Sequence, residues 1–598
     1  MAKGSLTTSL RHVAAPNGTS PWGWRQGPAR IGESSKITLE QRRSAVACQT
    51  WPPTQRRPRS DVAPLRGPRQ SIAKEVADGL GLPRFRTRAS RMQLIKSPTR
   101  FYKAIESIIE RAQERVFLSS LYIGKDETDL MDTLKTTLSK RPALRAIVLV
   151  DALRSTREGQ FRIDPVTRRP NTSCASLLAS LTRDFPDQVD VCLYRTSGLP
   201  VWLEKLIGKR VVEGAGLQHM KIYGGDNEFI MSGANLSHDY FSNRQDRYVH
   251  FWDQPLLSNY LISLILLCGH FSYRLMAAKA VEAGKEHPHH SAYALQWDGS
   301  NSQLLLGEAD DGTVNEGGCH IAALERQPLR EHKFAFDAGK LVNAFTQRWR
   351  QHCEEELANY NNTQVTNDED DDNAAFVVPL LQMGPLNITN ETDAMPRIFE
   401  ALRREGLAAD MPGCLDLTSG YFSLHSPYKS LVLDAPSEAF ETRIVAAAPE
   451  SNGFFGSKGI SRHIPMAYTW LEQKFWKAVQ RRGKERSIEL LEWVKSGWTY
   501  HAKGIWWTPP RTRALGPTHT LIGSSNFGYR SALRDLECTF LVEAPQSGQS
   551  CLTHVLKEEV NDLRHNATVP VNDALFAQDD RKVSWGVRIA AELIKGRL

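Results

Sequence analysis

Two separate stretches of the chain carry the same ordered set of polar residues. Each set begins with a His-x-Lys pair, continues with an Asn in a loop rich in Ser and Gly, and ends with a carboxylate. The members are His219, Lys221, Asn235 and Asp246 in the first set, and His501, Lys503, Asn526 and Glu537 in the second. The Asn and the carboxylate are eleven residues apart in both sets, so we interpret the sets as copies from an internal duplication.

These residue types suit chemistry at a phosphate group. Side chains alternate along a strand, so a His and a Lys two positions apart share a face. Ammonium and amide groups neutralise and hydrogen-bond phosphate oxygens, and an imidazole either attacks phosphorus or transfers a proton near neutral pH. A carboxylate that holds the second ring nitrogen fixes the tautomer of an imidazole, and Asp246 and Glu537 are the candidates for that role.

Two copies are significant because a phosphodiester exchange needs a nucleophile on one side of phosphorus and an acid on the leaving side. One His-x-Lys pair alone is more simply explained by a buried structural His, and one Asn in a Gly/Ser loop by turn chemistry. The repetition favours the catalytic interpretation. No Asp/Glu cluster of metal-binding type accompanies the motifs in the sequence, so we expect no metal and no other cofactor.

Helical and strand patterns alternate around both sets. Apolar residues at helical spacing lead into a strand over Val116–Ile123, and a second strand over Ala146–Val150 ends at Asp151. Strands at 417–421 and 443–447 repeat this pattern in the second half. We therefore predict an α/β fold of two pseudo-symmetric domains, each a mixed β-sheet flanked by helices, with one active site at their interface.

The charge of the chain is concentrated at its N-terminus. The formal net charge is +8, and residues 1–92 hold 17 Lys/Arg and 5 Asp/Glu, a net of +12, so the remaining chain carries −4. An Arg- and Ser-rich leader with few acids is typical of a mitochondrial presequence, with a disordered basic tail as the alternative. The slightly acidic remainder argues against a nucleic-acid partner, which normally requires clustered positive charge.

The length of the chain indicates several domains, and its apolar patterning indicates no membrane-spanning helix. A chain of 598 residues is too long for one core. We predict a basic presequence or leader (1–92), a first domain (93–290), a polar connecting region with a flexible acidic loop (291–375), and a second domain with C-terminal helices (376–598). The nine Cys form no Cys-x-x-Cys pair, which indicates free thiols in a reducing compartment. The longest apolar run is far shorter than the ~20 residues of a spanning helix, so we expect a peripheral protein.

The two sets resemble the HKD motifs of the phospholipase D superfamily, and the stretches around them resemble the eukaryotic-type phosphatidylglycerophosphate synthases within it. The matching stretches are QHMKIYGGD (218–226), SGANLSHDYFSNRQDRY (232–248), GWTYHAKGIWW (497–507), IGSSNFGYRSALRDLE (522–537), FLSSLYIG (117–124) and SNGFFGSKG (451–459). The resemblance covers residues 93–290 and 376–545, and it implies that each half is a phospholipase D-like domain.

The resemblance also implies an activity. CDP-diacylglycerol would donate its phosphatidyl group to sn-glycerol 3-phosphate at the matrix side of the mitochondrial inner membrane, giving CMP and phosphatidylglycerophosphate, the precursor of phosphatidylglycerol and cardiolipin. By superfamily analogy, His219 would form a phosphatidyl-histidine, while His501 protonates CMP and then deprotonates the acceptor hydroxyl. The motif Lys and Asn side chains would hold the phosphate oxygens. A direct displacement stays open, as do a phosphatidylserine synthase and a phospholipase D that uses water.

The second motif departs from the superfamily pattern at one position. Asp226 is the motif Asp of the first half, and Thr508 stands at the corresponding position of the second. We include Asp226 among the candidate catalytic residues but interpret it as structural support for its half. On that interpretation the substitution need not abolish catalysis, although the two halves are then not chemically equivalent.

Four further residues are candidates for substrate binding. Arg154 and Arg157 follow the second strand of the first half and could grip the phosphate of the acceptor, although solvated surface arginines are an equally good explanation. Lys458 lies in a Gly-rich segment (451–459) that suits a pyrophosphate cradle. Ser524 lies in the Ser/Gly loop of the second set.

Overall fold

The computed structural model describes residues 71–157, 172–196, 216–277, 289–296, 331–363, 373–545 and 550–594, and the statements below concern these residues. The chain divides into two units, residues 1–69 and 70–598, and the fold is that of the second. The first seventy residues of the predicted leader and the acidic run at 368–372 lie outside the described residues.

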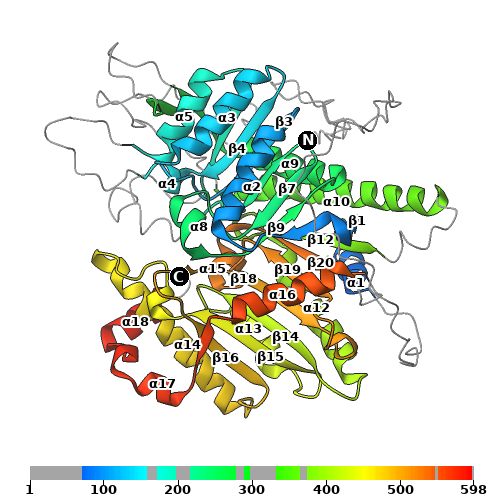
Figure 1. Cartoon of the computed structure of the whole chain (residues 1–598), viewed down its shortest axis with the longest axis vertical. Coiled ribbons are helices and arrows are strands. Elements are labelled where there is room, and N and C mark those ends of the chain that lie inside the picture. Colours follow the sequence, from blue (N-terminus) through cyan, green and yellow to red (C-terminus); the bar gives the residue numbers. More distant parts are fainter. Residues whose placement is uncertain are drawn as a thin grey trace, which may run out of the picture. The chain divides into compact units, whose positions relative to one another are not determined.

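The first half of this unit forms a nine-stranded mixed sheet flanked by helices (Figure 1). In spatial order the strands are β11 (Tyr293–Gln296), β10 (Tyr273–Ala277), β5 (Val189–Tyr194), β4 (Arg145–Asp151), β3 (Arg115–Ser119), β6 (Ile222–Gly225), β7 (Glu228–Ser232), β9 (Tyr248–Phe251) and β2 (Met92–Leu94). The flanking helices include α2 (Pro98–Arg111), α3 (Thr128–Lys140), α5 (Cys174–Asp184) and α9 (Pro255–His270).

Helix α2 shows how local sequence places these elements. It begins where the Ser97 side chain accepts the backbone N–H of Arg100, with Pro98 in the first turn. Its apolar positions Phe101 and Ile105 are buried because they recur at helical spacing and face β6 and β7. The sequence predicted this helix and the strand that follows it.

The second half forms a ten-stranded mixed sheet. In spatial order the strands are β1 (Phe85–Arg88), β12 (Ala374–Met383), β20 (Leu536–Glu543), β19 (His519–Gly523), β18 (Lys503–Thr508), β14 (Gly413–Ser419), β15 (Phe440–Ala447), β16 (Ile488–Trp493) and β21 (Ala567–Pro570), with β13 (Ile388–Thr389) paired to β12. Its helices include α12 (Asn390–Leu407), α13 (Ser426–Asp434), α14 (Ile464–Arg481), α16 (Cys551–Arg564), α17 (Asp573–Ala577) and α18 (Trp585–Ile594).

Six neighbouring strands have the same order and direction in both sheets. The run β5-β4-β3-β6-β7-β9 corresponds to β16-β15-β14-β18-β19-β20. In each run the first three strands are parallel and the remaining neighbours are antiparallel. The predicted duplication and the predicted α/β fold of two mixed sheets are therefore confirmed.

The leader boundary predicted at residue 92 is wrong. Helix α1 (Ile72–Leu80) begins at Ser71, whose side chain caps it, and its apolar face joins the core of the second half. Ser71 and the N–H of Ala73 both donate to the Glu543 carboxylate, and β1 then extends the second sheet beside β12. The sequence analysis missed this helix because the basic charge of 1–92 hid a short amphipathic segment.

The predicted connecting region also contains regular structure. The strand β11 (Tyr293–Gln296) belongs to the first sheet, and a 33-residue helix, α10 (Glu331–Thr363), follows it. The polar composition of this region did not show these elements. No helix among the described residues is both long and apolar enough to cross a membrane, α9 with its apolar run 261–268 included.

Candidate active site

Two short backbone pairings cross between the halves and place each motif histidine. Strand β17 (Thr499–Tyr500) pairs in parallel with β8 (Arg244–Gln245), and the N–H of His501 donates to the carbonyl of the last β8 residue at 2.8 Å. Likewise, the N–H of His219 donates to the carbonyl of Leu536 at 2.9 Å. In both pairings the next residue on the partner strand is a motif carboxylate, so each His faces the other half.

The side chains complete this crossed arrangement. Nδ1 of His501 lies 2.6 Å from Oδ2 of Asp246, and Nδ1 of His219 lies 3.0 Å from both carboxylate oxygens of Glu537. Both carboxylates are fully buried. Each imidazole is thus held by Nδ1, which leaves Nε2 for chemistry. The sequence selected these two carboxylates, but it did not show that each serves the histidine of the opposite half.

The two motif lysines lie beside the histidines. Nζ of Lys221 donates to the carbonyl of His219 at 2.6 Å, and Nζ of Lys503 donates to that of His501 at 2.5 Å. Burial lowers the pKa of Lys221 to about 7 and the pKa of Lys503 to about 8. Burial also lowers the pKa of both imidazoles and raises the pKa of both carboxylates that hold them. Positive charge is therefore costly here unless an anion lies close by, and a phosphate group would supply such a charge.

Charges of the two motifs act on one another, so the motifs form one site. The charge of Lys503 lowers the pKa of His219, and the charges of Lys221 and His219 lower the pKa of His501. The predicted convergence of both halves on one site therefore matches the geometry.

The motif asparagines line the same region. Nδ2 of Asn235 donates to the hydroxyl of Tyr240 at 3.2 Å, and that oxygen lies 3.3 Å from Nε2 of His501. The backbone N–H of Asn526 donates to Oγ of Ser531 at 3.1 Å, which fixes the loop of the second motif. Both side-chain amide oxygens are buried with no hydrogen-bond partner among the described residues. Both amides thus keep capacity for a ligand.

Two tyrosines that sequence reasoning missed border His501. The rings of Tyr240 and Tyr421 lie edge-on to the imidazole, with centroid distances of 5.1 and 5.3 Å. The guanidinium of Arg244 lies 4.6 Å from the centre of the Tyr240 ring. A Cβ on Gly453 would lie 2.9 Å from the Tyr421 hydroxyl and 3.2 Å from an Arg244 nitrogen, so the Gly-rich segment approaches closely. The signal was present, because Tyr240 lies in the motif stretch 232–248 and Tyr421 ends the repeated segment 417–421.

Asp226 is not part of this site. It follows β6, whereas His219 and Lys221 precede that strand. Its carboxylate accepts three consecutive backbone N–H groups before and at the start of β3, those of Gln113, Glu114 and Arg115, at 2.8, 2.9 and 3.0 Å. The structure therefore assigns it the supporting role and removes it from the catalytic candidates.

The geometry also explains Thr508. The residues of the second half that correspond to 113 and 114 are Pro412 and Gly413. Proline has no N–H to donate, and the N–H of Gly413 donates to the carbonyl of Ala439 at 3.0 Å. A carboxylate at position 508 would therefore be buried without two of the three donors that Asp226 has, so a neutral Thr suits this half.

The substrate-binding candidates fall in different places. The guanidinium of Arg154 lies 4.9 Å from the centre of the Tyr122 ring. Arg157 is partly exposed three residues further on, at the end of a described segment. Ser524 is fully buried and bonds the carboxylate of Glu537, so it positions that carboxylate.

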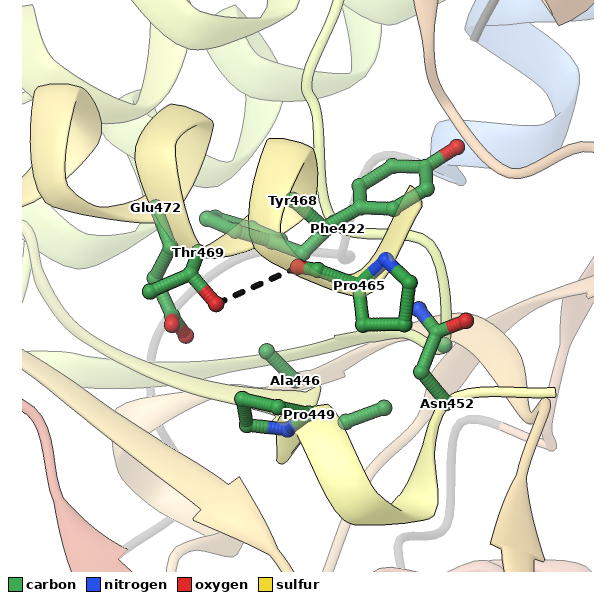
Figure 2. Close-up of a pocket in the computed structure, with 10 residues that line it drawn as sticks. Phe422, Ala446, Pro449, Asn452, Pro465, Tyr468, Thr469 and Glu472 are labelled. Carbon is green, nitrogen blue, oxygen red and sulfur yellow. Dashed lines mark hydrogen bonds between the residues drawn. The ribbon is translucent and has the colours of Figure 1, made fainter. Parts of the chain in front are cut away.

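The Gly-rich segment only partly matches its predicted role. The segment approaches the site at Gly453. Lys458 lies five residues further along the segment, and its side chain is exposed. A small pocket lies beneath the near end, lined among others by Asn452, Tyr468 and Glu472 (Figure 2). The Tyr468 ring also contacts the Tyr421 ring at 5.4 Å, so this pocket adjoins the His501 side of the site.

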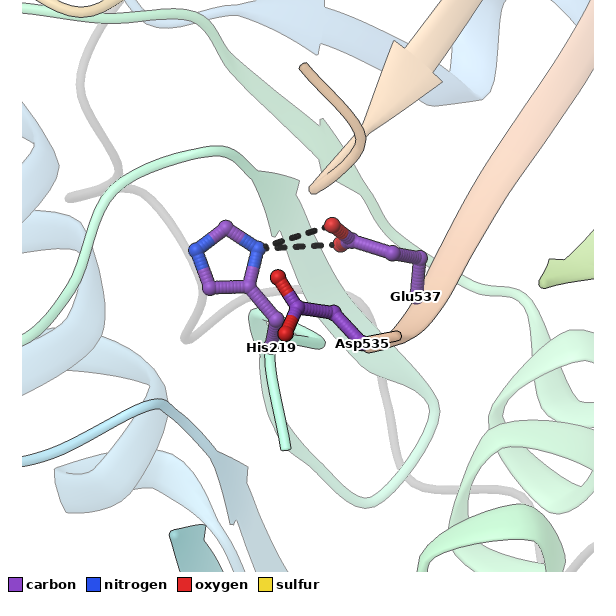
Figure 3. A group of neighbouring side chains, drawn as sticks. All are labelled: His219, Asp535 and Glu537. Atoms are coloured by element: carbon purple, nitrogen blue, oxygen red, sulfur yellow. Dashed lines mark hydrogen bonds and ion pairs between the residues drawn. The ribbon is translucent and has the colours of Figure 1, made fainter. Parts of the chain in front are cut away.

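Three groups gather tightly on the His219 side. One ligand atom each of His219, Asp535 and Glu537 lies within 4.8 Å of the others (Figure 3). Oδ1 of Asp535 accepts the N–H of Leu217 at 2.9 Å, and Oδ2 accepts Nε of Arg530 at 2.8 Å. Because hydrogen bonds already engage these oxygens and Nδ1 of His219, we interpret the cluster as an imidazole held between two acids.

Comparison with known proteins places this geometry in a family. No protein-family model matches the chain. The chain is 33% identical to a CDP-diacylglycerol–glycerol-3-phosphate 3-phosphatidyltransferase of Saccharomyces pastorianus, over 86% of this chain and 89% of that one. Identity to the mitochondrial enzyme of Homo sapiens is also 33%, over 86% and 84%.

A solved structure supports the fold. Phosphatidylserine synthase of Haemophilus influenzae matches 88% of this chain and 100% of its own with a TM-score of 0.58 and 16% identity. That match shows a shared fold and agrees with the predicted α/β fold of two halves, each built on a mixed sheet. With relatives above 30% identity over most of both chains, the protein belongs to the CDP-diacylglycerol–glycerol-3-phosphate 3-phosphatidyltransferase family.

Proposed function

We propose that this protein transfers the phosphatidyl group of CDP-diacylglycerol to sn-glycerol 3-phosphate, with His219 and His501 as the reacting imidazoles. The observation that carries the proposal is the crossed pairing of each imidazole with a buried carboxylate of the opposite half. Each imidazole presents Nε2, and neither half has a complete pair alone. A reaction in which one group attacks phosphorus and another transfers a proton needs two such imidazoles.

The remaining motif residues hold the phosphate. Lys221 and Lys503 supply ammonium groups, and Asn235 and Asn526 supply amides, to the non-bridging oxygens. A bound phosphate also offsets the desolvation that depresses the pKa of both lysines, so donor binding takes up protons near neutral pH. The partly buried Arg154, on the tyrosine side of the site, is placed to grip the phosphate of the acceptor.

The reaction proceeds in two displacements. In the first, Nε2 of one imidazole attacks the phosphatidyl phosphorus, the bond from phosphorus to the CMP oxygen breaks, and the other imidazole supplies the proton that CMP takes up. In the second, the 1-hydroxyl of glycerol 3-phosphate gives its proton to that second imidazole and attacks phosphorus as the P–N bond breaks. The products are CMP and phosphatidylglycerophosphate, and the protein is restored.

The reaction requires access to a lipid surface, and we place the protein peripherally on the matrix face of the mitochondrial inner membrane. Relatives named as mitochondrial and the basic, Ser-rich leader support this location. The Gly-rich segment beside the site exposes Phe455, which is 62% accessible two residues beyond Gly453. An exposed aromatic side chain next to the site suits contact with lipid.

An assay of CMP release tests the proposal. Purified protein is mixed with radiolabelled CDP-diacylglycerol in detergent micelles, with and without glycerol 3-phosphate, serine or water alone as acceptor. We expect CMP release that depends on glycerol 3-phosphate, with label in phosphatidylglycerophosphate. His219→Ala and His501→Ala should each abolish turnover while the unfolding midpoint stays near that of the wild type.

The alternative products identify the alternative enzymes. Phosphatidylserine as the main product would indicate a phosphatidylserine synthase, and free phosphatidate would indicate a hydrolase. Either result would overturn the proposed acceptor and leave the site intact. Undiminished CMP release by His501→Ala would overturn the site itself.

A further inference from the structure

The loop between β15 and α14, residues 451–463, carries an exposed aromatic side chain and exposed cations but no acid. Phe455 is 62% exposed. Two exposed cations follow it, Lys458 and Arg462. No Asp or Glu occurs in the sequence from 451 to 471, although the chain beyond the leader carries a net charge of −4. The loop is therefore a basic and aromatic stretch on a slightly acidic protein.

The base of the 451–463 loop is fixed beside the candidate active site. The Phe454 ring packs against the Tyr421 ring with a centroid distance of 5.8 Å, and Tyr421 in turn borders His501 at 5.3 Å. The N–H of Phe454 donates to Oδ1 of Asn452 at 3.0 Å, and Figure 2 shows Asn452 beside the beginning of α14. The two neighbouring phenylalanines thus diverge, since Phe454 packs toward the site and Phe455 is exposed.

The tip of the loop stands clear of the rest of the described chain. Gly456 and Gly459 have φ angles of 72° and 67°, which glycine adopts without strain. A Cβ built on either glycine would meet no atom of the described residues within 4 Å. The N–H of Ser457 donates to the carbonyl of Phe454 at 3.1 Å and closes the turn at the tip. The turn therefore presents Phe455 and Lys458 to the surroundings of the protein.

The chemistry of the loop fits an anionic lipid surface. An exposed aromatic ring gains free energy when it leaves water for the interfacial region of a bilayer. Lys and Arg side chains are attracted to the negative surface of a membrane that contains anionic lipids. The donor and the product of the proposed reaction are both phospholipids with anionic headgroups, so the surface that holds them is negatively charged. An acidic protein would match the two cations but gives no reason for the exposed Phe455 beside a lipid-processing site.

We infer that the 451–463 loop docks the protein on an anionic bilayer, with Phe455 inserted among the lipids and Lys458 and Arg462 bound to phosphate headgroups. The inference rests on the proposed function, which supplies the lipid substrate. It gives Lys458 a different partner from the one the sequence suggested, because the phosphates it binds belong to the membrane surface and not to the reacting pyrophosphate. Since Phe454 connects the loop to Tyr421, docking holds the His501 side of the site at the level of the headgroups.

Vesicle binding tests the docking role without any turnover. Full-length wild type, Phe455→Ser and the double variant Lys458→Ala/Arg462→Ala are mixed, without acceptor, with vesicles of phosphatidylcholine alone or of phosphatidylcholine with phosphatidylglycerol. Bound protein is measured by flotation at low salt. We expect the wild type to prefer the anionic vesicles, Phe455→Ser to bind them about 10-fold more weakly, and the double variant about 30-fold more weakly. The basic leader is present in every protein, so the differences report the loop.

Matched variants on other elements control for loss of any exposed ring or charge. Phe336→Ser removes a ring of α10 that is 57% exposed and lies 4.1 Å from Nζ of Lys340. The double variant Lys140→Ala/Arg348→Ala removes two exposed cations from α3 and α10. We expect both controls to bind within about twofold of the wild type. Equal weakening by a control and by its loop counterpart would overturn the inference, as would wild-type protein that binds neither kind of vesicle.

Hydrogen exchange of the wild type locates the contact and requires no variant to fold. Peptides that cover residues 451–463 are compared in the free protein and in protein bound to anionic vesicles. We expect exchange in these peptides to slow on binding, because the inserted turn leaves water. Protection confined to other parts of the chain would overturn the inference and assign the membrane contact elsewhere.

Turnover on two forms of the donor separates docking from a direct role in the reaction. The rate of CMP release with glycerol 3-phosphate is measured on CDP-diacylglycerol in anionic vesicles and on a short-chain form dispersed as monomers. Phe455→Ser should lower the ratio of the first rate to the second about 10-fold. Equal loss on both forms would contradict the docking role. Failure of glycerol 3-phosphate as acceptor on both forms would instead overturn the proposed function, while the vesicle experiment would still decide the role of the loop.

Discussion

Replacing Asp246 with Asn tests the crossed arrangement directly, because it removes one charge and keeps the shape. Oδ1 of Asp246 accepts the N–H of Arg247 at 2.8 Å, and Oδ2 faces Nδ1 of His501 at 2.6 Å. The Asn oxygen must keep the bond to the backbone N–H, so its NH₂ group turns to Nδ1. Nδ1 can then only accept, and the ring proton moves to Nε2, where it occupies the lone pair that His501 needs either to attack phosphorus or to accept a proton.

The expected loss follows from the wrong tautomer. Replacing the carboxylate that orients a catalytic His with Asn costs about 10⁴ in kcat in the Ser-His-Asp triad. We expect a loss of about 10³- to 10⁴-fold here, which corresponds to about 4–5.5 kcal/mol of activation free energy at 1.36 kcal/mol per decade. The measurement is the initial rate of CMP release with saturating CDP-diacylglycerol and glycerol 3-phosphate.

Asp226→Asn is the matched comparison, since it makes the same substitution at the motif Asp of the same half. Asp226 adopts a φ of 47°, which Asn tolerates, and one of its three N–H donors would lose its acceptor. We expect the free energy of unfolding to fall by about 1 kcal/mol, and kcat to stay within about threefold of the wild-type value. A folded Asp246→Asn protein that kept more than about a tenth of the wild-type kcat would refute the reasoning.

Three further predictions concern charge and stability. Burial lowers the pKa of Lys221 to about 7 and that of Lys503 to about 8, so the free protein loses both charges as the pH rises from 7 to 9. The value of kcat/KM for CDP-diacylglycerol should therefore fall over that range. A flat alkaline profile would contradict this prediction. Glu559→Gln should lower the free energy of unfolding in urea by about 3 kcal/mol, because Glu559 of α16 holds the buried guanidinium of Arg247 across the halves at 2.8 Å. An unchanged unfolding midpoint would contradict this prediction. Thr508→Asp should lower the free energy of unfolding by about 2 kcal/mol without raising kcat, since two of the three backbone donors that hold Asp226 have no counterpart in the second half. A gain in activity would show that the motif Asp has a catalytic role.

The sequence by itself determined the chemistry and the repeat. Three features are local properties of the chain and can therefore be recognised from the sequence: the identities of His219 and His501, the equal spacing from Asn to carboxylate, and the alternation of strand and helix. Helix α1 was missed because its apolar stripe is short and lies within a basic stretch, and only its burial against the second half makes it stable.

Only the tertiary structure decided which carboxylate serves which histidine. His219 and Glu537 are 318 residues apart, and His501 and Asp246 are 255 apart. Spacing within one half says nothing about a partner in the other, because parallel backbone pairing between the halves sets that register.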